Sequence, residues 1–216
     1  MAKALKNPLE AVLRIGFRTY VRVQGVVPFS HKVVAGQELP HFASRLYRES
    51  KLLKEALGDC RAEKSLEIGC GYGRLTPWIA ENSSQHYAVE PEEELLRDAE
   101  KLNPGVKFCH AKAQQLPYPD AFFDLCVTWT VLQHIPPTQI EKAVEEIKRV
   151  CKLTAFIVLA EDIGERCSDS YWQRTLDEYL ALMQPWQMVW HSQPIREEPS
   201  RLFPALVMRF QHPDSG

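Results

Sequence analysis

The spacing of hydrophobic and polar positions divides the chain into an N-terminal helical part and a longer alternating part. Apolar residues recur at helical spacing from Asn7 to Tyr20, where Asn7 and Pro8 are favourable residues for a helix start. A second amphipathic pattern extends from about His41 to Leu57. We expect residues 1–50 to form a helical lid that belongs to the same domain as the rest, residues 51–216.

From Ser65 onward, short apolar runs alternate with amphipathic helices, a pattern typical of βαβ units and a mostly parallel sheet. The runs predict five strands, at Ser65–Ile68, Gln85–Val89, Val106–His110, Phe123–Trp129 and Thr154–Ala160. The segments between them predict helices that begin near Arg74, extend from Glu92 to Leu102, and open with a capping box formed by Thr138 and Glu141.

The end of the chain adds a helix and two further strands. Apolar spacing predicts a helix over Ser170–Met183, and β-like runs follow at Gln187–Ser192 and Leu206–Gln211. The predicted fold is therefore α/β, a doubly wound Rossmann-like sheet. Its seven strands are mostly parallel, with a C-terminal antiparallel hairpin and N-terminal lid helices.

Composition and charge exclude only a few classes of function. The chain is 45% hydrophobic and 25% charged with a net charge of −2, which is ordinary for a globular protein and gives no overall field for nucleic acid. We find no apolar run of about 18 residues and no secretory signal, and we expect a cytoplasmic protein without a membrane span. The six cysteines form no CxxC, and we expect reduced, buried thiols.

The chemistry-bearing motif directly follows the first predicted strand. Residues 65–74 read SLEIGCGYGR, in which a strand leads into three glycines and then a helix. In a doubly wound sheet, ligands bind beyond the carboxyl ends of the strands, where glycines allow a close approach of the backbone. The dinucleotide motif GxGxxG would need a glycine at position 74, where this chain has Arg74, which argues against a nicotinamide oxidoreductase.

An acidic residue at the end of the second strand indicates a nucleoside ligand. Glu90 lies 19 residues after Gly71, where a carboxylate can accept hydrogen bonds from both hydroxyls of a ribose. The glycines alone are weak evidence for a nucleoside ligand. The full order of a strand, the glycines, a helix, a second strand and the acidic residue is a more specific pattern.

At this point the sequence resembles the class I S-adenosylmethionine-dependent methyltransferases of the small-molecule type. The resemblance covers about Lys51 to Ala160. Three stretches carry it, LEIGCGYG at 66–73, YAVEP at 87–91 and AQQLPYPDAFFDLCVTWTVLQHI at 113–135. The last stretch is similar to the family's segment that leads into the fourth strand and a V-L-x-H turn.

The resemblance implies a cofactor, S-adenosylmethionine, and a site for it. Its methionine part would lie against the segment that contains Glu67, Gly69, Gly71, Tyr72 and Gly73. The other implied contacts are Glu90 and Pro91 at the ribose, Ala113 and Gln114 at the adenine, and Trp129 and Thr130 beside the sulfonium. One position departs from the family. Lys112 stands where the family often has an acid that accepts a hydrogen bond from the adenine amino group. Because lysine has no acceptor, Gln114 or a backbone carbonyl would have to accept this hydrogen bond.

Candidate catalytic residues follow the fourth and fifth strands. His134 has the chemistry of a general base, although the family implies a structural role at this position. Glu161 and Asp162 are candidates for a base or a substrate contact, because they lie on the ligand side of the sheet. The histidines show no metal-ligand spacing, and we expect no metal. Seven further residues have a spacing that fits either core packing or the cover of an acceptor pocket. They are Phe42, Arg45, Tyr47, Arg48, Tyr171, Trp172 and Trp190.

The interpretation is a methyltransferase that transfers a methyl group to O, N or C of a small-molecule acceptor. Two alternatives stay open. Residues 1–34 hold six basic residues against Glu10 alone, so the N-terminal helix would suit an RNA-directed methyltransferase, although no RNA-binding module or basic-aromatic stripe is present and we do not expect a nucleic-acid partner. A non-catalytic cofactor-binding module is the second alternative, because no base stands out.

Overall fold

The structure is a computed structural model that describes residues 39–193 and 206–215, with side chains from Leu46 onward. The chain divides into two compact units, residues 1–52 and 53–216. Helix α3 (Leu39–Leu57) confirms the second predicted helix and crosses the boundary between the units. The helix expected over Asn7–Tyr20, with the basic residues around it, lies outside the described residues.

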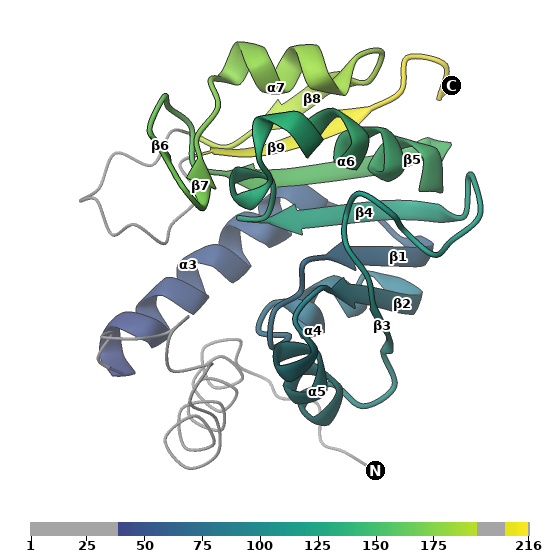
Figure 1. Cartoon of the computed structure of the whole chain (residues 1–216). Coiled ribbons are helices and arrows are strands. Elements are labelled where there is room, and N and C mark those ends of the chain that lie inside the picture. Colours follow the sequence, from purple (N-terminus) through teal and green to yellow (C-terminus); the bar gives the residue numbers. More distant parts are fainter. Residues whose placement is uncertain (1–38, 194–205, 216) are drawn as a thin grey trace. The chain divides into compact units, whose positions relative to one another are not determined.

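The second unit is built on a seven-stranded sheet with the order β3-β2-β1-β4-β5-β9-β8 (Figure 1). β1 to β5 run parallel, and β9 is antiparallel to both β5 and β8. The strands are β1 (Ala62–Ile68), β2 (Ser83–Glu90), β3 (Lys107–His110), β4 (Phe123–Trp129), β5 (Cys151–Glu161), β8 (Gln187–His191) and β9 (Leu206–Gln211). The predicted mostly parallel α/β sheet with its antiparallel C-terminal strand pair is confirmed.

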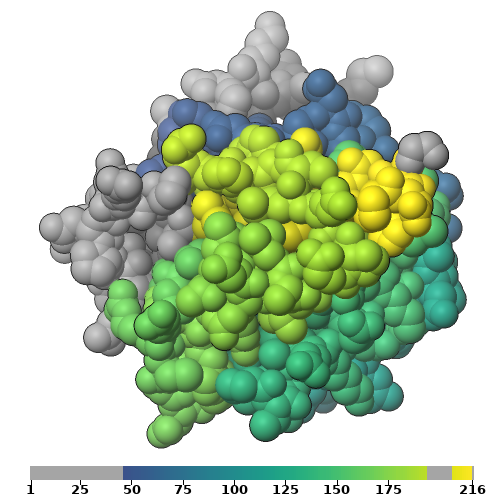
Figure 2. Space-filling model, turned by 90° about the horizontal axis from the view of Figure 1, so that it is seen from above, coloured from purple at the N-terminus to yellow at the C-terminus, as the bar shows by residue number. Residues whose placement is uncertain are grey.

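Helices and one 3₁₀ turn connect these strands. They are α4 (Thr76–Ala80), α5 (Glu93–Leu102), η1 (Leu132–His134), α6 (Pro137–Val150) and α7 (Leu176–Met183). α6 buries Ile140, Ala143, Val144 and Ile147 against the central strands. Figure 2 shows α7 and β8 in yellow-green beside the yellow C-terminal strand. Within the described ranges, no helix has both the length and the apolar character needed to cross a bilayer.

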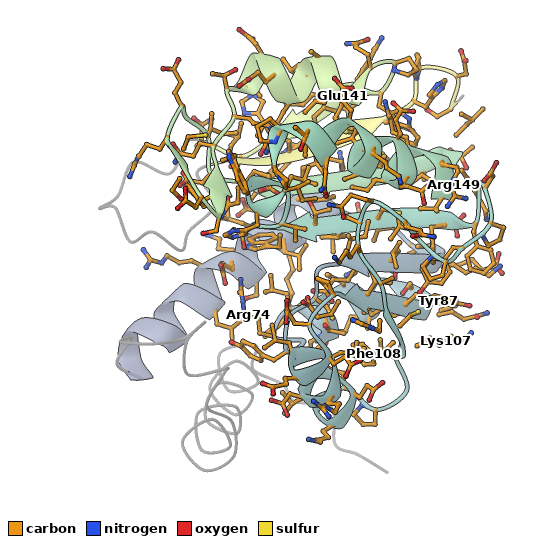
Figure 3. All side chains as sticks on the ribbon, viewed as in Figure 1. Arg74, Tyr87, Lys107, Phe108, Glu141 and Arg149 are labelled. Carbon is orange, nitrogen blue, oxygen red and sulfur yellow. The ribbon has the colours of Figure 1, made fainter. Side chains whose placement is uncertain are left out.

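One predicted helix start is confirmed and one is wrong. The helix expected near Arg74 has Leu75 as its N-cap and extends over Thr76–Ala80. The expected capping box of Thr138 and Glu141 does not form, since the helix starts earlier, with Pro136 as its N-cap and no side-chain cap. Proline suits the first helical position because its missing N–H has no helical partner there. Glu141 instead lies exposed on α6 (Figure 3).

The helix expected over Ser170–Met183 is also shorter than predicted. Tyr171 and Trp172 form the short strand β7 (Tyr171–Trp172), which pairs antiparallel with β6 (Cys167–Ser168). The helix begins after Thr175, whose hydroxyl accepts from the N–H of Glu178 while the Glu178 carboxylate accepts from the N–H of Thr175. This capping box fixes the helix start and leaves the aromatic pair in the hairpin.

All six cysteines are free thiols in the structure. Cys70, Cys126 and Cys151 are buried as expected, and Cys151 donates to the Cys126 sulfur at 2.9 Å. The expectation of burial is met only in part, because Cys60 and Cys109 are half-buried and Cys167, in the outer hairpin, is exposed.

Arg149, near the end of α6, holds the loop that precedes β4. Its guanidinium donates to the carbonyls of Leu116 and Tyr118 at 3.1 and 2.8 Å, and it pairs with Asp120 and Glu146 at 2.7 Å each. Figure 3 shows Arg149 at the end of the sheet remote from Arg74, which follows the glycine motif. The LPYPD part of the third motif is therefore fixed from the amino-terminal side of the sheet.

Candidate active site

The glycine motif forms a left-handed loop at the carboxyl end of β1. Gly69 and Gly71 have φ values of +69° and +56°, a conformation that L side chains rarely adopt. A Cβ at position 69 would lie 2.6 Å from the Cγ2 atom of Val131, so glycine is required there by a close approach of the next loop. A Cβ at position 71 would have no atom within 4 Å. The backbone of Gly71 is thus open to a ligand.

Glu90 connects the end of β2 to this loop. One carboxylate oxygen, Oε2, accepts from the N–H of Gly71 at 2.8 Å, and Oε1 accepts from the N–H of Glu92 at 3.1 Å. The residue is 5% exposed, and burial raises the pKa of its carboxyl group against the lowering effect of the two backbone donors. Two acceptor positions of the carboxylate remain for a ligand. Pro91, the next residue, is exposed and its carbonyl lies 2.7 Å from the Nε2 atom of His110.

Glu67 fixes the base of the loop from within β1. Its side chain is buried, and its Oε2 atom accepts from the Thr76 hydroxyl at 2.5 Å, across the whole loop. The Nε2 atom of His86 lies 3.6 Å from the same oxygen. These contacts connect the end of β1 to the start of α4 and so hold the loop between them. Tyr72 is buried within the loop.

A strained turn forms the neighbouring part of the site, at the end of β4. Trp129 is the last residue of the strand and is buried, and Thr130 has a φ value of +57°. This conformation is costly for a β-branched residue and is characteristic of functional sites. The N–H of Thr130 donates to the carbonyl of Ala160 at 2.7 Å, and its hydroxyl donates to the carbonyl of Trp129 at 2.7 Å.

Glu161 holds this turn in place. It is 0% exposed, and its two carboxylate oxygens accept from the N–H groups of residues 131, 132 and 133 at 3.0 to 3.2 Å. The Thr128 hydroxyl adds a contact of 3.3 Å. Burial raises the pKa of Glu161 to about 7, while the backbone hydrogen bonds oppose the rise. Glu161 was a candidate for a base or a substrate contact. Its hydrogen bonds instead favour a structural role, in which it positions the turn that covers Gly69.

The segment after β3 supplies the candidate adenine contacts. Ala113 is buried, and the side chain of Gln114 donates from Nε2 to the Oε1 atom of Gln139 at 2.8 Å. With this amide orientation, the carbonyl oxygen of Gln114 accepts no hydrogen bond from the described residues, so it is free to accept from an adenine amino group. Lys112 is exposed and pairs by backbone with Gln115.

His134 and the hairpin lie beyond the strained turn. The Nδ1 atom of His134 is 3.1 Å from the carbonyl oxygen of Ser170, and its ring contacts that of Tyr171 edge-on at 5.7 Å. Because a carbonyl only accepts, neutral His134 carries its proton on Nδ1 and has Nε2 as an acceptor. β7 contacts η1, so the hairpin is part of this edge.

Sequence reasoning missed three buried polar residues that support the turn. Arg174 donates to the carbonyls of Leu132 and Ile135 at 2.8 and 2.6 Å, and the Oε1 atom of Gln133 accepts from the N–H of Asp162 at 3.0 Å. Gln173 donates to the Asp162 carboxylate at 2.7 Å. No local pattern indicated these roles, because each joins residues about ten to forty positions apart.

The remaining candidates are divided between different parts of the chain. Tyr171 and Trp172 lie in the hairpin, whereas Trp190 belongs to β8, two strands beyond β5 in the sheet. The side chains of Phe42 and Arg45 lie outside the described residues, and Tyr47 and Arg48 belong to the first unit. Among the described residues, no group of three or more His, Cys, Asp or Glu side chains is suited to hold a metal ion.

Comparison with known proteins shows what this chain is similar to. Residues 66–159 match the family described as methyltransferase domain. The uncharacterized methyltransferase YcgJ of Bacillus subtilis is 29% identical over 132 residues, which cover 55% of this chain and 51% of YcgJ. A probable S-adenosylmethionine-dependent methyltransferase of Mycobacterium tuberculosis is 34% identical over 76 residues, 35% of this chain and 28% of that protein. The chain spans about half or less of the length of these curated relatives.

The fold is shared with solved methyltransferase structures. One is the 1,6-didemethyltoxoflavin-N1-methyltransferase of Burkholderia thailandensis with bound 1,6-didemethyltoxoflavin and S-adenosylhomocysteine. Its TM-score is 0.63 at 19% identity, and the alignment covers 98% of this chain and 93% of that one. Residues 66–159 therefore match a methyltransferase domain, and the chain shares its fold with solved methyltransferases.

Proposed function

We propose that the protein transfers the methyl group of S-adenosylmethionine to an O, N or C atom of a small-molecule acceptor. The observation that carries the proposal is the convergence of three features on one sheet edge. These are the open backbone at Gly71, the Glu90 carboxylate beside it, and the strained turn at Thr130. A similar protein named as a probable S-adenosylmethionine-dependent methyltransferase and a solved methyltransferase with bound S-adenosylhomocysteine support S-adenosylmethionine as the ligand.

The described residues fit the cofactor in the order of the strands. Ala113 and Gln114 after β3 would contact the adenine, and Glu90 at the end of β2 would accept from the ribose hydroxyls. The loop after β1 would hold the methionine part. Trp129 and Thr130, at the end of β4, would lie beside the sulfonium. The aromatic ring of Trp129 would favour this cation through cation–π attraction, and negative charge nearby would favour it through charge attraction.

The bound cofactor supplies an activated methyl group, so the chain's own residues mainly have to orient the reactants. Correct orientation of two reactants accounts for roughly 7 to 11 kcal/mol of a barrier. The rigid hydrogen bonding of Glu161 to residues 131–133 provides a fixed surface for this purpose. If the methyl group is transferred to a hydroxyl oxygen, the Nε2 atom of His134 can take the proton of that hydroxyl.

The test is calorimetry of S-adenosylmethionine binding to the wild type and to Glu90→Gln, followed by mass spectrometry of an acceptor panel for the gain of one methyl group. We expect binding by the wild type, weaker binding by the variant, and S-adenosylhomocysteine formed in proportion to methylated acceptor. Binding without any S-adenosylhomocysteine formation would instead support a non-catalytic module. No binding by the wild type would refute the proposed function.

A further inference from the structure

A half-buried carboxylate lies at the next position along the proposed cofactor site. The cofactor contacts follow the carboxyl ends of β3, β2, β1 and β4 in sheet order, and β5 is the next strand. Two acidic residues, Glu161 and Asp162, stand at its end. Glu161 is buried beneath the turn, whereas Asp162 is half-buried. An acceptor beside the sulfonium at β4 would therefore meet Asp162 as the next acidic side chain.

Neutral groups fix the position of Asp162. Its Oδ2 atom accepts from the Tyr171 hydroxyl and from the Nε2 atom of Gln173, the latter at 2.7 Å, while its own N–H donates to Gln133. Burial and the hydrogen bond to Asp162 raise the pKa of Tyr171 to about 12, so the phenol remains a donor at neutral pH. The hairpin thus orients the carboxylate without cancelling its charge.

Asp162 has no cation partner among the described residues, unlike Asp124 and Glu146. Asp124 pairs with Lys152 at 2.7 Å, and Glu146 pairs with Arg149 at 2.7 Å. Among the described residues, no Lys, Arg or His forms an ion pair with Asp162, and no donor reaches its Oδ1 atom. The nearby Arg166 contributes its backbone N–H to Gln173 at 3.0 Å, and its side chain is exposed.

Aromatic rings border the same position. Tyr171 contacts Asp162 through its hydroxyl and His134 through its ring edge, with ring centroids 5.7 Å apart. A carboxylate with a free oxygen beside aromatic rings is suited to bind a positively charged nitrogen, which gains both charge attraction and cation–π attraction.

We propose that Asp162 is the recognition site of the methyl acceptor and that this acceptor carries a positively charged nitrogen. Tyr171 and Gln173 are positioning residues that hold the carboxylate toward the ligand. The inference rests on the proposed function, because it places the acceptor next to the cofactor. With an amine acceptor, Asp162 binds the ammonium form, the ammonium then loses one proton to water, and the neutral nitrogen takes the methyl group while S-adenosylhomocysteine leaves.

The experiment compares matched acceptors and matched variants. S-adenosylhomocysteine formation is measured with benzylamine and phenethylamine, with the corresponding alcohols, and with the corresponding carboxylates. The variants are Asp162→Asn and Tyr171→Phe, with Asp169→Asn as the control, since Asp169 is an exposed acid in the turn of the same hairpin. Calorimetry with S-adenosylmethionine and thermal unfolding are measured for each protein.

We expect product with the amines and none with the carboxylates. Asp162→Asn should lower kcat/KM for the amines at least tenfold, mainly through KM, while cofactor affinity stays within twofold. Tyr171→Phe should raise KM to a smaller extent, and Asp169→Asn should behave as the wild type. A structural role alone would change the melting temperature without this selective rise in KM.

Three results would overturn the inference. They are unchanged amine kinetics in Asp162→Asn, turnover restricted to neutral or anionic acceptors, and absence of amine-dependent product while the cofactor binds. Loss of cofactor binding in the wild type is different, because it refutes the proposed function itself. The two failures are therefore distinguishable.

Discussion

Replacing Gly71 with alanine separates the conformational role of the glycine loop from its role in binding. At a φ value of +56°, a side chain costs about 1 to 2 kcal/mol of folding free energy. No further steric cost arises, because the new Cβ has no atom within 4 Å. For a protein of this size we expect a decrease in melting temperature of ~2 to 8 °C.

Gly71→Ala should also weaken cofactor binding. The added methyl group would enter the open position where the loop backbone approaches the cofactor. We expect S-adenosylmethionine affinity to fall at least tenfold, which corresponds to ~1.4 kcal/mol or more. The assay is titration calorimetry combined with thermal unfolding monitored by circular dichroism.

Gly105→Ala is the matched control for this substitution. Gly105 also has a positive φ value, +98°, and a Cβ there would likewise have no atom within 4 Å. It lies between α5 and β3, away from the carboxyl edge of the sheet. We expect it to destabilise the fold without weakening cofactor binding. If Gly71→Ala bound S-adenosylmethionine as tightly as Gly105→Ala does, the reasoning about the open loop would be refuted.

Three further experiments, with four substitutions, test other parts of the account. Glu90→Gln should weaken S-adenosylmethionine binding by about 1 to 3 kcal/mol in calorimetry, as expected for a lost charged hydrogen bond, and equal affinity would remove Glu90 from the site. Because the folded-state pKa of Glu161 is raised from 4.5 to about 7, its contribution to stability is complete below about pH 4.5 and is lost as the pH rises through 7. The loss should amount to about 3 kcal/mol in urea unfolding and be absent from Glu161→Gln, so parallel pH profiles would contradict it. Thr175→Ala should cost ~1 kcal/mol of unfolding free energy, whereas Thr138→Ala should change it by less than ~0.5 kcal/mol, and equal effects would contradict the observed helix starts.

The strands were the most predictable part of the fold. Phe123–Trp129 was predicted with its observed bounds, because a strand buried in a parallel sheet is a continuous apolar run. The predicted helix over Ser170–Met183 failed in its first part, since a short hairpin with Tyr171 and Trp172 has the same apolar spacing as a helix turn. Local periodicity does not distinguish these two structures over a few residues.

The candidate site was predictable only where its chemistry lies in a contiguous motif. The glycine loop and Glu90 follow directly from strand ends and spacing. The strained φ value of Thr130 was not predictable, because threonine is disfavoured in that conformation and only tertiary contacts hold it there. The anchoring role of Glu161 likewise depends on backbone donors about 30 residues away.

The most direct test of the central claim is a crystal structure of the protein with S-adenosylhomocysteine. The account predicts the ribose hydroxyls within hydrogen-bonding distance of the Glu90 carboxylate, the amino-acid part over Gly71, and the sulfur beside Trp129 and Thr130. An adenosine bound elsewhere, or no adenosine bound at saturating concentration, would contradict it.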